Sequence, residues 1–385
     1  MRLAVIGRLL VTVLLARRGL TGTPRRILQG GETLDKVQYN GRPDSPADDA
    51  FGASSVADAL GSGDGSNLAA TPLPKHRRAV TWVTQKDAAT ELVAISQPST
   101  ISDIEQLKNY VYDGNSGIKS FAYHLEMGAA PQRHPAEFPH VAPKHLLTPR
   151  AQGLGRQPGE DYSPRFHGTC TADKAVGQQY GVAKKATLVV VTIADLSVEE
   201  FTAGFQEIAI DLVAHPERRK FSVVTLSICG PRHDPEDPVL PPAMQLLKNA
   251  VQEVMDMDVP VVVAAGNGMS AAFAEMFPDN FPLVVVGAND LKINDKAPYS
   301  QLYPTLYAVG SDTTCWAEST TTPDTRLEGT SGGQIANLLS YDDVPIDTSD
   351  GKLVQSMKDY FESDRGGWDR RPHAHVLWNG VLTSS

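Results

Sequence analysis

Cysteine is scarce in this chain, which limits how the fold can be held together. Only three cysteines occur, Cys170, Cys229 and Cys315. An odd number leaves at least one thiol free in a monomer, so at most one disulfide can form. This excludes the small extracellular folds that rely on several disulfides in place of a hydrophobic core.

Long apolar runs and excess positive charge are also missing. No run approaches the roughly 20 apolar residues that a membrane-spanning helix needs. The formal net charge is −10, and no basic stripe with interleaved aromatic residues occurs, so nucleic acid is not an expected partner. Neither a Gly-x-Gly-x-x-Gly nor a Walker A pattern is present, which argues against a nucleotide-binding protein.

The first residues of the chain have some, but not all, of the features of a signal peptide. Residues 1–18 contain Leu9–Ala16, a short apolar stretch that follows two arginines and is typical of a signal peptide, although a small-x-small cleavage site is missing. The chain also has no Asn-x-Ser/Thr glycosylation sequon. We expect a secreted protein, and an intracellular one is the alternative.

Residues 19–95 have the composition of a linker or pro-segment. The stretch 41–74 is rich in Gly, Ser, Asp, Pro and Ala, which cannot bury enough apolar surface to offset the entropy cost of ordering. It leads into Lys75-His76-Arg77-Arg78, either a dibasic processing site of a zymogen or a solvated basic patch. Residues 96–385 then form the expected main domain, with a C-terminal extension.

Strand and helix patterns alternate through the middle of this domain. Short apolar, β-branched runs at 187–193, 221–228, 259–264 and 283–286 predict buried strands. Apolar residues at helical spacing predict helices at 197–214, which opens with a Ser197/Glu200 capping box, and at 242–257. This alternation predicts an α/β fold with a mostly parallel central sheet and helices on both faces.

Three short motifs follow one another along the chain and carry a chemical pattern. They are His167-Gly168-Thr169, Ala264-Ala265-Gly266-Asn267 and Gly329-Thr330-Ser331. They supply a general base, an amide donor for an oxyanion, and a hydroxyl nucleophile that needs such a base. Asn267 follows a predicted strand, at the edge of a parallel sheet where ligands bind.

With these motifs, residues 117–340 resemble the subtilisin-like serine proteases, and most of all their proteinase K-like and fungal branch. The order acid, histidine, serine is that of subtilisin. The resemblance implies a serine endopeptidase with His167 as base, Ser331 as nucleophile and Asn267 as oxyanion donor. The sequence departs from the family after Ser331, where Gly332–Asn337 lacks the usual proline.

The acid of the triad is the largest departure from the family. The family places an aspartate at the end of its first core strand, and Tyr123–Gly128 aligns with that motif, followed by the landmark His134–Phe138. On this alignment Glu126 takes the acid position, and triads with glutamate do exist. The alternative is Asp113, but its segment resembles the entry to that strand, where we expect it to cap a turn.

The resemblance also implies how substrate binds. Ser227-Ile228-Cys229-Gly230 matches the segment that lies alongside an extended substrate backbone, and Ala264–Gly266 would form the facing wall of the S1 pocket. Cys170 falls near a free cysteine of proteinase K-like enzymes, so we expect a free, packed thiol. We expect no cofactor; calcium as a structural ion cannot be read from the scattered acidic residues.

The expected partner is therefore a peptide or protein substrate, and the expected state is a monomer. Glu126 and the unusual run after Ser331 leave one rival open. It is a catalytically silent subtilase fold that binds peptides or a partner protein.

Overall fold

The computed structural model describes residues 80–97, 108–227, 241–266, 277, 281–293, 295–300, 304–316, 330–341, 344–371 and 374–381. All of them belong to one unit, Asn40–Ser385. The expected signal peptide, the stretch 41–74 and the basic site at 75–78 lie outside the described residues.

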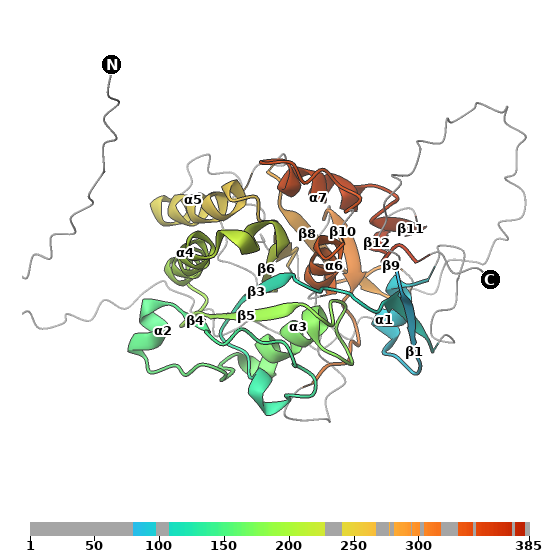
Figure 1. Cartoon of the computed structure of the whole chain (residues 1–385), viewed down its shortest axis with the longest axis horizontal. Coiled ribbons are helices and arrows are strands. Elements are labelled where there is room, and N and C mark those ends of the chain that lie inside the picture. Colours follow the sequence, from blue (N-terminus) through green and yellow to red (C-terminus); the bar gives the residue numbers. More distant parts are fainter. Residues whose placement is uncertain are drawn as a thin grey trace, which may run out of the picture. The chain divides into compact units, whose positions relative to one another are not determined.

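A ten-stranded sheet, in the order β11-β12-β10-β8-β7-β6-β3-β5-β4 with β9 beside β8, forms the centre of this unit (Figure 1). Neighbouring strands are parallel, except that β8–β9 and β11–β12 are antiparallel. The strands are β3 (Phe121–Glu126), β4 (Leu146–Leu147), β5 (Thr187–Thr192), β6 (Ser222–Leu226), β7 (Val261–Ala264), β8 (Val284–Asp290), β9 (Asp295–Lys296), β10 (Leu306–Val309), β11 (Gly367–Arg371) and β12 (Ala374–Leu377).

Helices cover both faces of this sheet, as the sequence predicted. They are α1 (Thr90–Ile95), α2 (Pro149–Gly153), α3 (His167–Val176), α4 (Val198–Ala214), α5 (Pro242–Asp256), α6 (Thr330–Leu339) and α7 (Leu353–Glu362). Short 3-10 helices are η2 (Pro131–Arg133), η3 (Pro164–Phe166) and η4 (Pro216–Phe221). The chain therefore has the expected α/β architecture.

Alternation along the central strands builds two cores, because successive side chains of a strand point to opposite faces. Tyr123 and Leu125 of β3 pack with α4 and α5 on one face. Ala122 of β3 packs with α3 and α6 on the other face. Figure 1 shows α4 and α5 on one side of the sheet and α3 on the other. Strands β5 and β6 contribute to both cores in the same way.

Secondary structure is present before residue 96, the start that the sequence predicts for the main domain. β1 (Trp82–Gln85) pairs antiparallel with β2 (Tyr110–Asp113) in a separate two-stranded sheet, and α1 follows β1. Leu92 and Ile95 of α1 are buried in the core that α3 and α6 share. Residues 80–95 are therefore part of the folded unit rather than of a linker.

The predicted capping box at α4 is only half formed. The hydroxyl of Ser197 accepts from the N–H of Glu200, as expected. The carboxylate of Glu200 does not return to Ser197: its Oε2 accepts from the N–H of Ala194 at 2.6 Å and from the hydroxyl of Thr148 at 2.6 Å. Glu200 thereby ties α4 to the end of β5 and to the start of α2.

Candidate active site

Glu126 and His167 meet at one edge of the sheet. Glu126 is the last residue of β3, and His167 is the first residue of α3. Oε1 of the carboxylate lies 2.5 Å from Nδ1 of the imidazole, and both residues are buried. The second oxygen, Oε2, accepts from the N–H of Met127. The carboxylate can therefore fix both the orientation and the tautomer of the ring.

Two side chains of the preceding loop cap α3 and hold His167 in place. The hydroxyl of Ser163 accepts from the N–H of Gly168 at 2.8 Å, and Oδ2 of Asp161 accepts from the N–H of Thr169 at 2.7 Å. These N–H groups have no partner within the helix, so capping stabilises its first turn. Burial raises the pKa of the Asp161 carboxyl above its ordinary value.

Close packing requires a glycine at position 168, directly after His167. A Cβ at position 168 would lie 1.9 Å from the carbonyl oxygen of Gly128, which no side chain tolerates. Just before His167, Arg165 and Phe166 both have a positive φ, of 56° and 57°, a conformation that costs energy for residues with a Cβ. The entry to α3 is thus closely packed against the loop after β3.

Ser331 lies in the first turn of α6, which packs against α3. Gly333 permits the close approach of these helices, because a Cβ there would lie 2.5 Å from the carbonyl oxygen of Ala175. Ser331 is buried, and among the described residues its hydroxyl has no hydrogen-bond partner.

Asp113, the alternative acid, has a structural role in this fold. It lies at the end of β2, and its Oδ1 accepts from the N–H of Asn115 at 3.1 Å in the following turn. That contact is the turn cap that its sequence context predicted. The structure thus brings Glu126, and not Asp113, to Nδ1 of His167.

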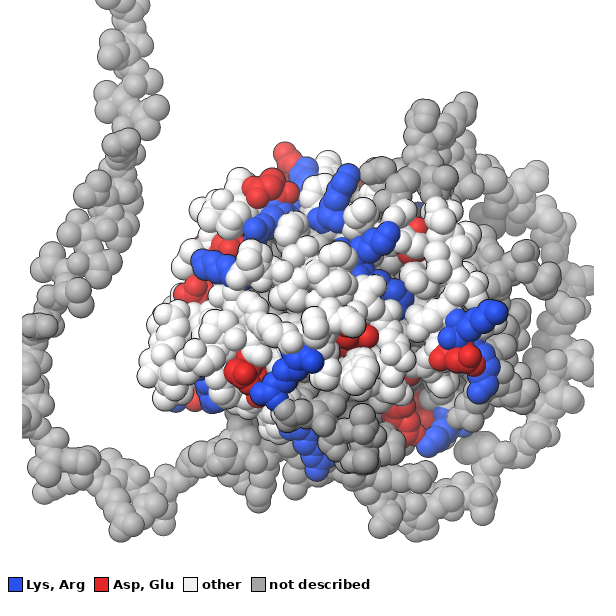
Figure 2. Space-filling model, turned by 60° about the horizontal axis from the view of Figure 1, so that its bottom comes forward, with Lys and Arg blue, Asp and Glu red and all other residues white. Residues whose placement is uncertain are grey.

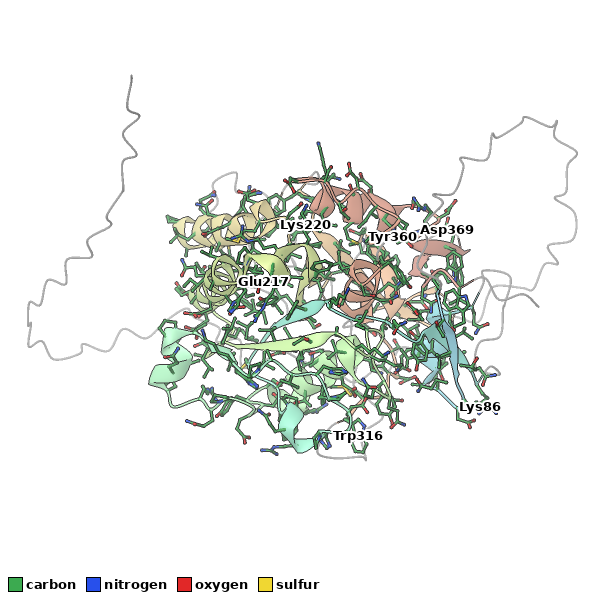
Figure 3. All side chains as sticks on the ribbon, in the orientation of Figure 1. Lys86, Glu217, Lys220, Trp316, Tyr360 and Asp369 are labelled. Atoms are coloured by element: carbon green, nitrogen blue, oxygen red, sulfur yellow. A yellow bond between two sulfur atoms is a disulfide. The ribbon has the colours of Figure 1, made fainter. Side chains whose placement is uncertain are left out.

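The expectation that Cys170 is a free thiol is wrong. Cys170 on α3 forms a disulfide with Cys315, and 145 residues separate the two in sequence. Flanking contacts fix the same segment: the N–H of Thr314 donates to Glu91 at 2.9 Å, and that of Trp316 donates to Asp173 at 2.7 Å. The side chain of Trp316 is labelled in Figure 3. The histidine helix is therefore tied covalently to the segment 313–316.

The expected substrate-binding residues are only partly described. Ser227 follows β6 and is half-buried, while Ala264 ends β7 and is buried with Ala265. Gly266 turns with a φ of 95°, which favours glycine. These two chain ends lie side by side, because β6 and β7 pair in parallel. Ile228, Cys229, Gly230, Asn267 and Gly329 lie outside the described residues.

One polar residue at this site was missed in the sequence. His124 on β3 is buried, and it hydrogen-bonds the carbonyl of Gly168, the residue after His167. A signal was present, because a histidine two positions before Glu126 in a buried strand must lie on the same face as Glu126. Within the described ranges no group of three or more His, Cys, Asp or Glu residues is arranged to hold a metal ion.

The fold is that of a subtilisin-like protein. No protein-family profile matches the chain. Among solved structures, it resembles a cold-adapted subtilisin-like serine proteinase, with a TM-score of 0.56, 20% identity and coverage of 76% of this chain and 98% of that one. It also resembles Sphericase, with a TM-score of 0.50, 17% identity and coverage of 71% and 90%.

Curated relatives are fungal. A subtilisin-like protease of Coccidioides posadasii is 30% identical over 193 residues, which cover 48% of this chain and 41% of the relative. Alkaline protease 1 of Aspergillus clavatus is 29% identical over 256 residues, which cover 64% and 56%. The chain thus spans about half the length of the curated relatives it matches. Its sequence is thus similar to fungal subtilisin-like and alkaline proteases, and its fold is subtilisin-like.

Proposed function

We propose that the chain is a serine endopeptidase that hydrolyses peptide bonds through an acyl-enzyme, with Glu126, His167 and Ser331 as its triad. The observation that carries the proposal is the hydrogen bond between Oε1 of Glu126 and Nδ1 of His167. A base that is oriented by a buried carboxylate is the arrangement a serine nucleophile requires. The names of the fungal relatives agree with this chemistry.

The proposed reaction proceeds in two steps. His167 takes the proton of the Ser331 hydroxyl as the oxygen attacks the substrate carbonyl, and then gives that proton to the leaving amine. Glu126 stabilises the imidazolium that forms between these events. Water then attacks the acyl-enzyme as His167 takes its proton, and His167 returns that proton to the Ser331 oxygen as the ester bond breaks and the second product leaves.

The developing oxyanion needs fixed donors. We assign these to the side-chain amide of Asn267 and the N–H of Ser331 at the start of α6, since such donors act where negative charge appears in the transition state. The substrate backbone would lie as an added strand between Ser227–Gly230 and Ala264–Gly266. Apart from the water of the second step, the proposed reaction uses only groups of the protein.

Ser331 must gain its contact with His167 during the reaction. Its hydroxyl has no partner among the residues described here. Catalytic hydrogen bonds often tighten only in the substrate complex, so this geometry agrees with an enzyme without substrate. The same observation favours the rival function, a catalytically silent subtilase fold that binds peptides or a partner protein.

We further propose that the protein is secreted, as a zymogen processed near residues 75–78. The disulfide Cys170–Cys315 supports secretion, because such bonds persist in oxidising compartments and are rare in the cytosol. No helix in the described part of the chain is long and apolar enough to cross a membrane.

We propose that the protein is a monomer that acts on peptides or proteins. On the face drawn in Figure 2, Lys and Arg residues are interspersed with Asp and Glu. Such mixed charge does not provide the single-sign stripe that nucleic acid binding uses.

Peptide hydrolysis by the full chain tests the proposal against its rival. A parent protein that cleaves peptide substrates, and a His167→Ala variant that does not, would establish the enzyme. A parent that binds peptides without cleaving them, before and after proteolytic removal of residues 1–79, would establish the silent binder.

A further inference from the structure

His124 lies on β3 beside the proposed active site but takes no part in the reaction proposed above. Its side chain points to the same face of the sheet as Glu126, two residues further on, since side chains alternate along a strand. That face carries α3 and α6. His124 is 1% exposed. A buried polar ring in a strand core is costly unless it is hydrogen-bonded, so its partners indicate its role.

One ring nitrogen of His124 holds the start of α3. Nε2 lies 2.9 Å from the carbonyl oxygen of Gly168. A carbonyl only accepts hydrogen bonds, so Nε2 carries the proton. Thr171 reinforces the contact: its hydroxyl lies 3.1 Å from the same nitrogen and donates to the carbonyl of His167 at 3.0 Å. The carbonyl groups of both His167 and Gly168 are thereby held by hydrogen bonds.

The other ring nitrogen reaches the strand that leads to the substrate-binding segment. Nδ1 lies 3.0 Å from the hydroxyl of Thr225, which is the direct neighbour of His124 in the β3–β6 register. With the proton on Nε2, Nδ1 accepts and Thr225 donates. Burial lowers the pKa of His124 to about 4, so the ring is neutral around pH 7 and holds both bonds in this single tautomer.

Thr225 in turn lies against the residue after the proposed nucleophile. A Cβ at Gly332 would lie 2.2 Å from the Cγ2 methyl of Thr225. The methyl group therefore fixes how closely the first turn of α6 approaches the sheet. His124 thus lies in a continuous set of contacts that joins the residue after His167 to the residue after Ser331.

We propose that His124 is a positioning residue for the triad, which sets the separation of His167 and Ser331 through Gly168 and through Thr225 and Gly332. Glu126 orients the imidazole ring of His167 from the same strand face. His124 places the backbone that carries this ring. The inference rests on the proposed function, because a set separation matters only if the two side chains exchange a proton.

The kinetic test compares His124→Leu with the matched control Tyr123→Phe. Leucine removes both hydrogen bonds of the ring, whereas Tyr123→Phe removes a buried hydrogen bond to Asp211 from the opposite face of the same strand. His124→Leu should lower kcat by about 10- to 100-fold with little change in KM, the cost of a small misplacement of reacting groups. Tyr123→Phe should leave kcat unchanged.

Two further variants separate positioning from folding. His124→Gln keeps a donor for the Gly168 carbonyl and should recover part of the lost kcat. Thr225→Val keeps the shape of the side chain but removes the donor to Nδ1, and it should lower kcat in the same direction as His124→Leu. It serves as the test if His124→Leu does not fold. If His124→Leu has the same kcat as Tyr123→Phe, the inference is overturned. If His124→Leu does not fold, an equal kcat in Thr225→Val and Tyr123→Phe overturns it.

An NMR measurement, which does not depend on catalytic activity, tests the inference separately from the proposed function. The proton on Nδ1 of His167, bonded to Glu126, should give a downfield NMR signal in the parent and in Tyr123→Phe. We expect this signal to broaden or disappear in His124→Leu, because the ring loses its fixed position. If the parent cleaves nothing, the proposed function fails and the NMR signal alone decides: an unchanged signal in His124→Leu overturns the positioning role, and its loss supports it.

Discussion

Oε1 of Glu126 lies 2.5 Å from Nδ1 of His167, although 41 residues separate the two in sequence. The contact arises because β3 ends and α3 begins at the same edge of the sheet. Glutamate reaches the ring from a strand end where the family usually has the shorter aspartate. The longer side chain therefore does not prevent the contact that a triad requires.

The first prediction concerns this carboxylate. Glu126→Gln should lower kcat steeply, since an amide cannot stabilise the imidazolium and can hold the wrong tautomer; the equivalent Asp→Asn change in a serine protease costs roughly 10,000-fold. Glu126→Asp should be milder, because it keeps the charge and restores the family's usual residue. Steady-state kinetics on a peptide substrate measure both effects.

Asp113→Asn is the control for that experiment. Its side chain bonds the turn at Asn115, so the variant should keep its kcat. If Asp113→Asn were the crippling change and Glu126→Gln stayed active, the acid would have to be reassigned.

A second prediction addresses the oxyanion. Asn267→Ala should lower kcat by roughly 100- to 1,000-fold with little change in KM, the range found for an oxyanion-hole amide in subtilisin. The measurement is again kcat and KM on one peptide. An effect on KM alone would mean that Asn267 only positions the substrate.

The disulfide gives a third prediction. Replacing Cys170 and Cys315 together by alanine should lower the free energy of unfolding by about 2–4 kcal/mol, because the bond closes a long loop in the unfolded chain. Denaturant unfolding of both proteins without reductant measures the difference. Alkylation of the unfolded, non-reduced parent should modify Cys229 alone; modification of all three cysteines would show that the bond is not formed.

The pH dependence of stability gives a fourth prediction. The folded pKa of His124, about 4, lies below its ordinary value of 6.5, so between these values the unfolded chain binds the extra proton. The contribution of His124 to stability is therefore present above pH 6.5 and is lost as the pH falls to about 4. It amounts to roughly 3 kcal/mol.

Urea unfolding at pH 7 and at pH 4.5 measures this effect. The parent should lose more stability between these pH values than His124→Leu does, because the variant lacks the group that titrates. An equal loss in the two proteins would show that His124 binds its proton equally in the folded and unfolded chains.

The hydrophobic pattern was sufficient to predict the centre of the fold. β5, α4, β6, α5, β7 and β8 lie within or near their predicted ranges, since each helix buries one apolar face and each strand is a short, buried apolar run. The disulfide could not be predicted, because nothing local brings Cys170 next to Cys315. The role of His124 depends on the register of β3 against β6, which a single sequence does not specify. The attachment of β12 to β10 is likewise a long-range pairing.

The site was predictable to the extent that short motifs carry it. Tripeptides predict His167 and Ser331 as site residues, and alignment with a strand motif predicts Glu126, which the structure places at Nδ1 of His167. The capping residues Asp161 and Ser163 lie in a loop without regular secondary structure. No periodic pattern in the sequence therefore predicts that they contact the start of α3.

Labelling with a fluorophosphonate probe, followed by mass mapping of the modified residue, tests the central claim most directly. Such probes react with a serine hydroxyl that a neighbouring base has activated. The triad predicts that the label falls on Ser331 in the parent and that Ser331→Ala abolishes both labelling and peptide cleavage. Labelling that survives in Ser331→Ala, or a parent that is inert to probe and peptide alike, would contradict it.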